Sequence, residues 1–285
     1  METTIKIIGV NGETATIAGE RAGDKGVYLA SELSGFMDPE VVVQSESPAN
    51  YPGGRYVSHR TQVRRVLFAV EILNDGPGFR SWRSRDSEWR KMWAYDKPTQ
   101  IQVSTPDGTR TLNAHLESVE VVTDIDPNIQ PINRTIMTVV AYDPFWWGIE
   151  RTYEAEVANG FATVSVPEAN PTDQDVWPIW VVEADGQWTL PDYSFKNDDL
   201  ADRRVELPVL AVGEHTVVNT NPMARQLTSV TNSPVWQRMN GKRFRHPIPP
   251  YTGEVDFLVS RNGSSTSRKV QLRLQRPFSR PWGML

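Results

Sequence analysis

Apolar and polar residues alternate with a period of two through much of the first half of the chain. Apolar side chains recur at every second position in five stretches, residues 5–7, 66–72, 101–103, 112–116 and 136–140. Successive side chains of a strand point to opposite faces of a sheet, so this pattern predicts half-buried antiparallel strands. Turn-forming runs, such as NDGPG at 74–78 and PDG at 106–108, separate them. The first half is therefore predicted to be an antiparallel β domain.

The stretch RSWRSRDSEWRKMW, residues 80–93, breaks this alternation. With about 100° between successive residues of a helix, Trp82, Trp89 and Trp93 fall within an arc of roughly 40°. Three arginines are expected to point away from this stripe: Arg83, Arg85 and Arg90. Cationic and aromatic residues together would also suit a nucleic acid or a membrane surface, but apolar residues at helical spacing usually face a core. We therefore predict one amphipathic helix near residues 80–94, with its tryptophans packed on the sheet.

The run AYDPFWWG, residues 141–148, separates two alternating patterns. Asp143-Pro144 ends a strand and Gly148 allows a turn, which places the end of a first domain at residue 148 and the start of a second at residue 151. Six strand candidates follow in residues 151–285: FATVSV, PIWVVEA, RVELPVL, HTVVN, EVDFLVS and KVQLRLQ. Their spacing predicts a β-sandwich. Residues 184–204 lack periodicity and are predicted to form a long surface loop.

Composition narrows the functional classes. The chain has 30 Lys and Arg residues against 35 Asp and Glu, a formal net charge of −5, which argues against general binding to nucleic acid. The absence of cysteine excludes disulfides and thiolate metal sites. No segment approaches the ~20 consecutive apolar residues of a membrane-spanning helix, so no membrane insertion is expected. The 21 prolines favour sheet, because proline breaks helices.

Candidate catalytic chemistry is sparse. The four histidines are far apart in the sequence, and no HExxH, GxSxG or phosphate-loop motif is present. Two aspartate pairs have the spacing of oxygen ligands in calcium loops, Asp124/Asp126 and Asp173/Asp175, but neither continues into the rest of such a loop. A cell-wall hydrolase would need two carboxylates or a zinc site in one cleft, and nothing in the sequence places them. We expect no enzymatic activity, no cofactor and no metal.

Seven segments, in their order along the chain, carry a resemblance to a known family. They are GGRYVSHRTQVRRVLFAVEIL, RSWRSRDSEWRKMWAYDKP, TQIQVSTPDGTRTLNAHLESVE, AYDPFWWG, VWPIWVVEADGQWTLPDYSF, HTVVNTNP and the terminal RPFSRPWGML. Together they extend over nearly the whole chain, which resembles the distal tail, or minor tail, proteins of long-tailed bacteriophages (siphoviruses), particularly those infecting mycobacteria. Residues 184–204 and 234–250 depart from this pattern, since they are more elaborate than a minimal sandwich requires.

The resemblance implies a mainly β fold with two domains. Residues 1–148 are expected to form a tail-tube-like β-sandwich or split barrel with one helix, and residues 151–285 a galectin-like β-sandwich. The resemblance further implies a structural component of the virion, located at the tail tip and made in the host bacterial cytoplasm. Six copies would form a ring that joins the tail tube to the tip. The implied partners are copies of the chain itself, the tail tube protein, the tape-measure protein and tail-tip proteins, with DNA passing through the lumen without specific binding.

Two sets of candidate contact residues follow from these expectations. Ring closure would use complementary charges in the first domain, because arginine pairs with carboxylates in a planar, bidentate geometry. The expected basic residues are Arg55, Arg60, Arg64, Arg65, Arg83, Arg85 and Arg90, and the expected acidic residues are Glu117, Glu120, Asp124 and Asp126. As an alternative function, the second domain would bind host cell-wall carbohydrate through an exposed aromatic face. The candidates for that face are Trp177, Trp180, Trp188 and Tyr193.

Overall fold

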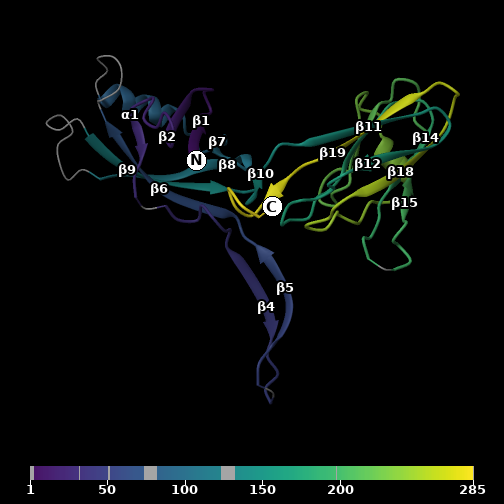
Figure 1. Cartoon of the computed structure of the whole chain (residues 1–285), viewed down its shortest axis with the longest axis horizontal. Coiled ribbons are helices and arrows are strands. Elements are labelled where there is room, and N and C mark those ends of the chain that lie inside the picture. Colours follow the sequence, from purple (N-terminus) through teal and green to yellow (C-terminus); the bar gives the residue numbers. More distant parts are fainter. Residues whose placement is uncertain are drawn as a thin grey trace. The chain divides into compact units, whose positions relative to one another are not determined.

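The computed structural model describes residues 3–31, 33–50, 52–73, 82–122, 132–196 and 198–284. The chain divides into two compact units, one made of Met1–Gly148 together with Phe278–Met284, and the other of Ile149–Pro277. Both are built mainly of antiparallel strands, and the described part of the chain contains one α-helix and one short 3-10 helix (Figure 1). The prediction of a mainly β chain is confirmed.

A nine-stranded sheet forms the first unit. Its main path runs β2-β1-β7-β8-β9-β6-β3, and β10 pairs with β8 and with β20. The strands are β1 (Thr4–Ile8), β2 (Thr14–Ala18), β3 (Val27–Leu29), β6 (Arg64–Leu73), β7 (Thr99–Thr105), β8 (Gly108–Val122), β9 (Ile132–Ala141), β10 (Trp146–Trp147) and β20 (Pro277–Phe278). The two ends of the main path, β2 and β3, also lie against each other, so the sheet curls into a nearly closed barrel. All five stretches of predicted alternation lie in these strands.

Alternate residues of these strands form the core of the first unit. In β6, the residues at every second position from Val66 to Ile72 are buried, whereas Arg65 and Leu67 are exposed. Ile7 of β1 lies opposite Ile101 of β7, and both side chains join the same core. Burying a side chain of this size favours folding by about 1.5–3 kcal/mol. In β1, β6, β7 and β8, the alternation read from the sequence is thus the alternation between core and solvent. In β9 it has the wrong phase, because the core residues are Met137, Val139 and Ala141 and not those at 136, 138 and 140.

The helix α1 spans Trp82–Lys91, and Trp89 on the helix and Trp93 just after it pack into this core. Trp89 and Trp93 are buried, and their rings meet edge to face with centroids 5.4 Å apart. The ring of Trp93 also lies 5.8 Å from that of Phe68 on β6. Trp82 is only half-buried, so the predicted tryptophan stripe is confirmed for two of its three members.

Residues Val41–Glu46 (β4) and Arg55–Thr61 (β5) form a separate two-stranded sheet that extends away from the barrel (Figure 1). We call this hairpin the arm. Its strands pair along their whole length, with one irregularity after Gln44. At its base, the backbone N–H of Gln62 donates to the carbonyl oxygen of Glu40 at 2.8 Å. The strands of the arm are not among those that the alternation predicts.

Two sheets share one core in the second unit. One has the order β11-β19-β13-β16-β17 and the other the order β12-β18-β14-β15. The strands are β11 (Arg151–Val157), β12 (Gly160–Val166), β13 (Ile179–Val182), β14 (Gln187–Pro191), β15 (Arg204–Glu206), β16 (Thr216–Asn219), β17 (Leu227–Ser229), β18 (Val255–Asn262) and β19 (Arg268–Leu274). The rings of Trp180 on β13 and Phe257 on β18 meet edge to face, 5.9 Å apart. This arrangement is a β-sandwich.

The prediction of a long loop at residues 184–204 is wrong in part. Strand β14 lies inside it, and Leu190 on that strand is buried. The following turn is held by the buried carboxylate of Asp192, which contacts the guanidinium of Arg203 and accepts the backbone N–H of His246 at 3.0 Å. Burial and the nearby Arg203 lower the pKa of His246. Much of this segment is therefore an ordered part of the sandwich.

The last described residues return to the first unit. The sequence assigns residues 151–285 to the second domain, whereas Phe278–Met284, here called the C-terminal tail, belongs with the first unit. The guanidinium of Arg110 on β8 explains this placement. It donates to the carbonyl oxygens of Arg280 at 2.8 Å and Gly283 at 2.6 Å, and lies 3.4 Å from the ring centroid of Phe278. Sequence alternation carries no information about such backbone contacts.

Candidate assembly surfaces

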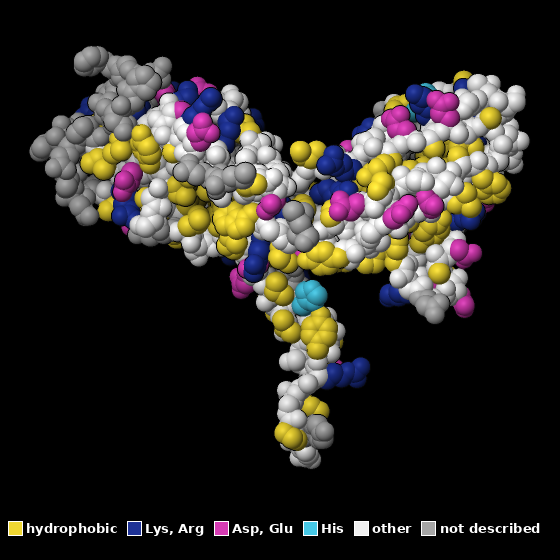
Figure 2. All heavy atoms as spheres, viewed as in Figure 1, with side chains coloured by type: hydrophobic (Ala, Val, Ile, Leu, Met, Phe, Trp, Pro, Cys, Tyr) yellow, Lys and Arg dark blue, Asp and Glu magenta, His cyan; other side chains and the backbone are white. Residues whose placement is uncertain are grey.

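The arm exposes an apolar surface that is not covered by any described residue of its unit. The side chains of both strands are exposed almost throughout, including Val42, Val43, Tyr56 and Val57, with Val43 59% exposed. None of them belongs to the core of the first unit. Figure 2 shows apolar side chains on the surface of the arm. A lone two-stranded hairpin is at best marginally stable, and contiguous exposed apolar surface marks contact sites. The arm is therefore the strongest candidate contact surface.

Two of the predicted basic residues lie on the arm. Arg55 and Arg60 are both exposed on β5. Arg60 lies opposite Val42 on the neighbouring strand, and Arg55 lies opposite Glu46. The arm thus combines apolar side chains with guanidinium groups, which are over-represented at protein–protein interfaces. This combination suits a partner surface that offers carboxylates beside apolar side chains.

Arg64 was predicted to be an exposed interface residue, and this is wrong. Only 1% of the residue is accessible to solvent. Its guanidinium donates to five backbone carbonyl oxygens at 2.6 to 3.1 Å, those of Gly35, Phe36, Met37, Pro144 and Ser279. Burial lowers the pKa of Arg64 to about 10, although Asp38 acts in the opposite direction. Arg64 therefore holds three segments of the first unit together and faces no neighbour.

Arg65, by contrast, is exposed and pairs within its own chain. Its Nε lies 3.2 Å from both carboxylate oxygens of Glu117 on β8. An exposed pair of this kind contributes little to stability. Glu120 is also exposed near the end of β8. The other two predicted acidic residues, Asp124 and Asp126, lie outside the described residues.

Of the three predicted arginines on helix α1, two are exposed and one is buried. Arg83 and Arg90 are exposed, whereas Arg85 is buried and donates from Nη1 to the carbonyl oxygen of Leu73 at 3.0 Å. The prediction that Arg85 faces solvent or a neighbour is therefore wrong. Its position explains the burial, because residues four apart lie on the same side of a helix and Arg85 precedes the buried Trp89 by four.

The aromatic residues proposed for carbohydrate do not form an exposed face. Trp180 and Trp188 have no solvent-accessible surface, and the indole N–H of Trp188 donates to the carbonyl oxygen of Glu183. Tyr193 stacks on the ring of Phe257 at 5.9 Å and packs against the core. Trp177 is half-buried. The prediction is wrong for Trp180 and Trp188, because the inward positions of a sandwich strand are filled by its largest apolar residues.

The described residues contain no group of three or more His, Cys, Asp and Glu side chains arranged to hold a metal. This search includes the pair Asp173/Asp175, where burial raises the pKa of Asp175. No helix within the described part is long and apolar enough to cross a membrane. The histidines are dispersed: His59 lies on the arm, His115 on β8, and His215 and His246 in the second unit.

The apolar residues of the arm are the candidate site that the sequence analysis missed. A signal for them exists, since Val41, Val42 and Val43 form an unbroken β-branched run between Pro39 and Pro48. The segment RYVSHRT follows a Gly-Gly pair, which completes a strand–turn–strand pattern. Alternation does not reveal these strands because both of their faces are exposed.

Comparison with known proteins identifies two relatives of the chain by sequence. No family model matches it. It is 39% identical to the minor tail protein Gp27 of Mycobacterium phage L5, over an alignment that covers 99% of both chains. It is 38% identical to the minor tail protein Gp27 of Mycobacterium phage D29, with the same coverage.

Solved structures share the fold at low sequence identity. The Dit protein (gp 19.1) of phage SPP1 matches with a TM-score of 0.64 and 12% identity, over 97% of this chain and 99% of that one. A chain of the phage P2 baseplate matches with a TM-score of 0.51 and 10% identity, over 97% of this chain and 98% of that one. Taken with the sequence identity over the full length of both mycobacteriophage relatives, the chain belongs to the family of phage minor tail proteins, structural components of the virion with a Dit-like fold.

Proposed function

We propose that six copies of the first unit close into a ring at the distal end of the tail tube and join the tube to the proteins of the tail tip. The minor tail protein relatives support a place in the tail. The SPP1 protein with the same fold is described as a paradigm of the hub adsorption apparatus in phages that infect Gram-positive bacteria. That description supports a place at the hub.

The arm is the observation that carries this proposal. A closed ring needs a heterologous contact, in which one patch of a protomer meets a different patch of the next. The exposed valines of β4 provide such a patch, because they lie outside the core of their own unit. The arm of one protomer would lie across the barrel of its neighbour and bury Val41 and Val43 there, which share one face of β4. Each valine so buried contributes on the order of 1–2 kcal/mol.

Fewer charged residues are available for this contact than the sequence analysis predicts. Arg64 and Arg85 are buried and take no part. The remaining exposed basic candidates are Arg55, Arg60, Arg83 and Arg90, beside Arg65 with its own partner Glu117. We place the arm arginines against the acidic end of β8 in the neighbouring copy, which carries Glu120. Charges at the rim of an interface set register and association rate more than affinity.

The ring would contact the tail tube protein on one side and tail-tip proteins on the other, with the tape-measure protein and then DNA in its lumen. A formal net charge of −5 suits a channel through which DNA slides, because strong phosphate contacts would hold it back. In this proposal the chain acts as a scaffold at the tail tip and catalyses no reaction.

The test is to remove the arm. Residues 41–61 are excised and Glu40 is joined to Gln62 through an Asn-Gly turn, which the hydrogen bond between their backbones should accommodate without strain. Mass photometry compares this variant with the intact chain, alone and with purified tail tube protein. The intact chain should give particles of six chain masses. The excised chain should remain a monomer with an unchanged melting temperature.

A point variant separates contact from fold. Val43→Asp places a charge on the arm and should abolish assembly, whereas Val212→Asp, at a valine of the second unit that is 88% exposed, should not. Assembly of the armless chain into the same particles would contradict the proposal. So would an intact chain that stays monomeric even beside the tail tube protein.

A further inference from the structure

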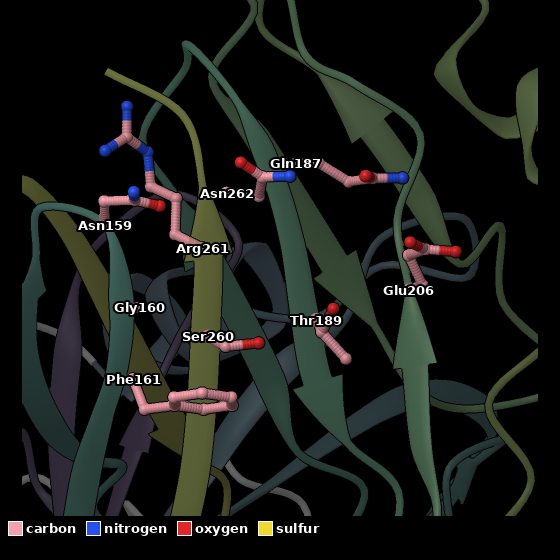
Figure 3. Close-up of a pocket in the computed structure, with 9 residues that line it drawn as sticks. All are labelled: Asn159, Gly160, Phe161, Gln187, Thr189, Glu206, Ser260, Arg261 and Asn262. Atoms are coloured by element: carbon pink, nitrogen blue, oxygen red, sulfur yellow. The ribbon is translucent and has the colours of Figure 1, made fainter. Parts of the chain in front are cut away.

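One sheet of the second unit carries a polar cavity on its outer face. The sheet is β12-β18-β14-β15, and the cavity has a volume of about 250 Å³. Figure 3 shows the side chains that line it, which include Phe161, Ser260, Thr189, Glu206, Asn262 and Gln187. Precisely placed polar groups fix the orientation of a small ligand in a concave site, and this cavity gathers several such groups beside one aromatic ring.

Strand register arranges these side chains in two rows. Phe161 lies opposite Ser260, Ser260 opposite Thr189, and Thr189 opposite Glu206, so one row crosses all four strands. Asn262 lies opposite Gln187, two residues along, and forms a second row on the same face. The fold therefore gathers one aromatic ring and five polar side chains from four separate stretches of chain.

Phe161 sits at one end of the first row with its ring in solvent. It is 69% exposed, whereas Trp188, which points to the other face of the same sheet, is fully buried. Phe161 does not belong to the core cluster of the unit. An exposed aromatic ring beside a polar cavity offers a flat apolar surface on which the carbon-bound hydrogens of a saturated ring can pack.

The polar groups beside Phe161 keep their hydrogen-bonding capacity. The side chains of Thr189, Ser260 and Asn262 make no hydrogen bond to any residue that the structure describes. The amide nitrogen of Gln187 donates to the carbonyl oxygen of Leu207 at 3.2 Å, whereas its amide oxygen accepts no hydrogen bond from any described residue. Hydroxyl and amide groups both donate and accept, so this set can bind a ligand that does the same.

The charged groups at the cavity are already paired. The carboxylate of Glu206 accepts from Nζ of Lys242 at 2.6 Å. The guanidinium of Arg261 donates to the carbonyl oxygens of Asp185 at 2.8 Å and Thr266 at 3.0 Å, and its side chain has no exposed surface. A ligand with a phosphate or a carboxylate would bind best beside an unpaired cation, and the residues that line the cavity offer none. This leaves a neutral ligand.

We propose that this cavity binds a neutral hexopyranose unit of a polysaccharide. The apolar face of the sugar ring stacks on Phe161, and its hydroxyl groups exchange hydrogen bonds with Ser260, Thr189 and Asn262. The site replaces the buried aromatic set predicted from the sequence and uses none of its residues. It lies within the second unit alone, so it holds whether or not the first unit forms a ring.

The test uses the intact chain on an array of neutral hexose and N-acetylhexosamine oligosaccharides, followed by isothermal titration calorimetry with the strongest binder. Phe161→Ala should weaken binding by roughly tenfold or more, since it removes the stacking surface. Phe161→Trp should retain binding, because it keeps an aromatic face. Asn262→Ala and Ser260→Ala should each weaken it. All four variants should melt at the wild-type temperature, since these side chains lie outside the core.

Tyr95→Ala is the matched control, because Tyr95 is 67% exposed but lies in the first unit. It should bind as the wild type does. The proposal fails if the intact chain binds none of the neutral sugars at millimolar concentration. It also fails if Phe161→Ala binds as well as the wild type, or if inorganic phosphate or an acidic oligosaccharide competes and binds more tightly.

Discussion

The arm strand β5 and the barrel strand β6 follow each other in the chain with only two residues between them, yet they have opposite relations to solvent. In β6, Val66 and the alternate residues after it are buried, and Arg64 before them is buried as well. In β5, Tyr56, Val57 and Arg60 are all exposed. Both segments have the composition of strands, so composition does not separate a core strand from a contact strand.

The difference lies in what surrounds each strand. Strand β6 has β9 on one side and β3 on the other, which gives its inward side chains a closed core. Strand β5 has β4 alone. An apolar side chain on β5 therefore has no core to enter within the described unit, and only contact with another molecule would bury it. In the proposed ring, the arm's apolar residues therefore serve assembly, whereas those of β6 serve folding.

The largest predicted effect comes from placing one charge in β6 and, for comparison, one in the arm strand β4. Val66→Asp buries a carboxylate at a site with no exposed surface, and should prevent the first unit from folding, because an unpaired buried charge costs more than the unit's stability of roughly 5–15 kcal/mol allows. Val43→Asp should change the free energy of unfolding by less than about 0.5 kcal/mol. Urea denaturation followed by circular dichroism measures both. Equal losses would remove the distinction between the strands.

Removal of the C-terminal tail should have the next largest effect. Deleting residues 278–285 takes away buried Phe278 and the carbonyl oxygens that accept from Arg64 and Arg110. We expect the first unit to lose about 4 kcal/mol or more, from the lost apolar burial and the donors left without acceptors. Scanning calorimetry should show one transition lowered and the transition of the second unit unchanged. If both shift together, the tail stabilises the whole chain.

Arg60 on the arm and Arg64 on β6, four residues apart, allow a direct comparison of an exposed and a buried guanidinium. Arg64→Ala leaves five carbonyl oxygens of the first unit without their common donor, and should cost about 3–5 kcal/mol. Arg60→Ala on the arm should cost less than about 0.5 kcal/mol. Equilibrium unfolding in urea gives both values. A stable Arg64→Ala protein would show that the buried guanidinium is dispensable.

A small effect is also predicted for the exposed ion pair at the barrel surface. Arg65→Ala removes a pair with Glu117 in which both side chains are well exposed, and should change stability by about 0.2–1 kcal/mol. The difference from wild type should shrink further in high salt, because exposed charges are screened. A loss as large as that of Arg64→Ala would contradict the division of the two neighbours into surface and core.

Alternation located the five strands β1, β6, β7, β8 and β9 because each of them has one face in the core, but it did not predict β2, β3, β10 or β20. Helical spacing found Trp89 and Trp93, since it puts them on one side of a helix. Arg64 could not be found this way. Its burial depends on carbonyl groups from residues 35–37, 144 and 279, which only the folded chain brings together.

The candidate sites were less predictable than the fold. Charged type alone indicated Arg64 and Arg85 as surface residues, and aromatic type alone indicated Trp180 and Trp188 as sugar contacts, yet all four are buried. Whether a strand residue points inward depends on register, which the sequence leaves open in short strands such as β14. Phe161 was not predicted for the same reason, because successive residues of its strand alternate between the core face and the solvent face.

Cryo-electron microscopy of the assembled tail tip tests the central claim most directly, since it locates the arm of each copy. The account predicts six copies in a closed ring, with Val41 and Val43 of each arm buried against the barrel of the next copy and Arg55 or Arg60 beside that copy's Glu120. A ring closed by other surfaces, with the arms in solvent or missing from the contacts, would contradict it.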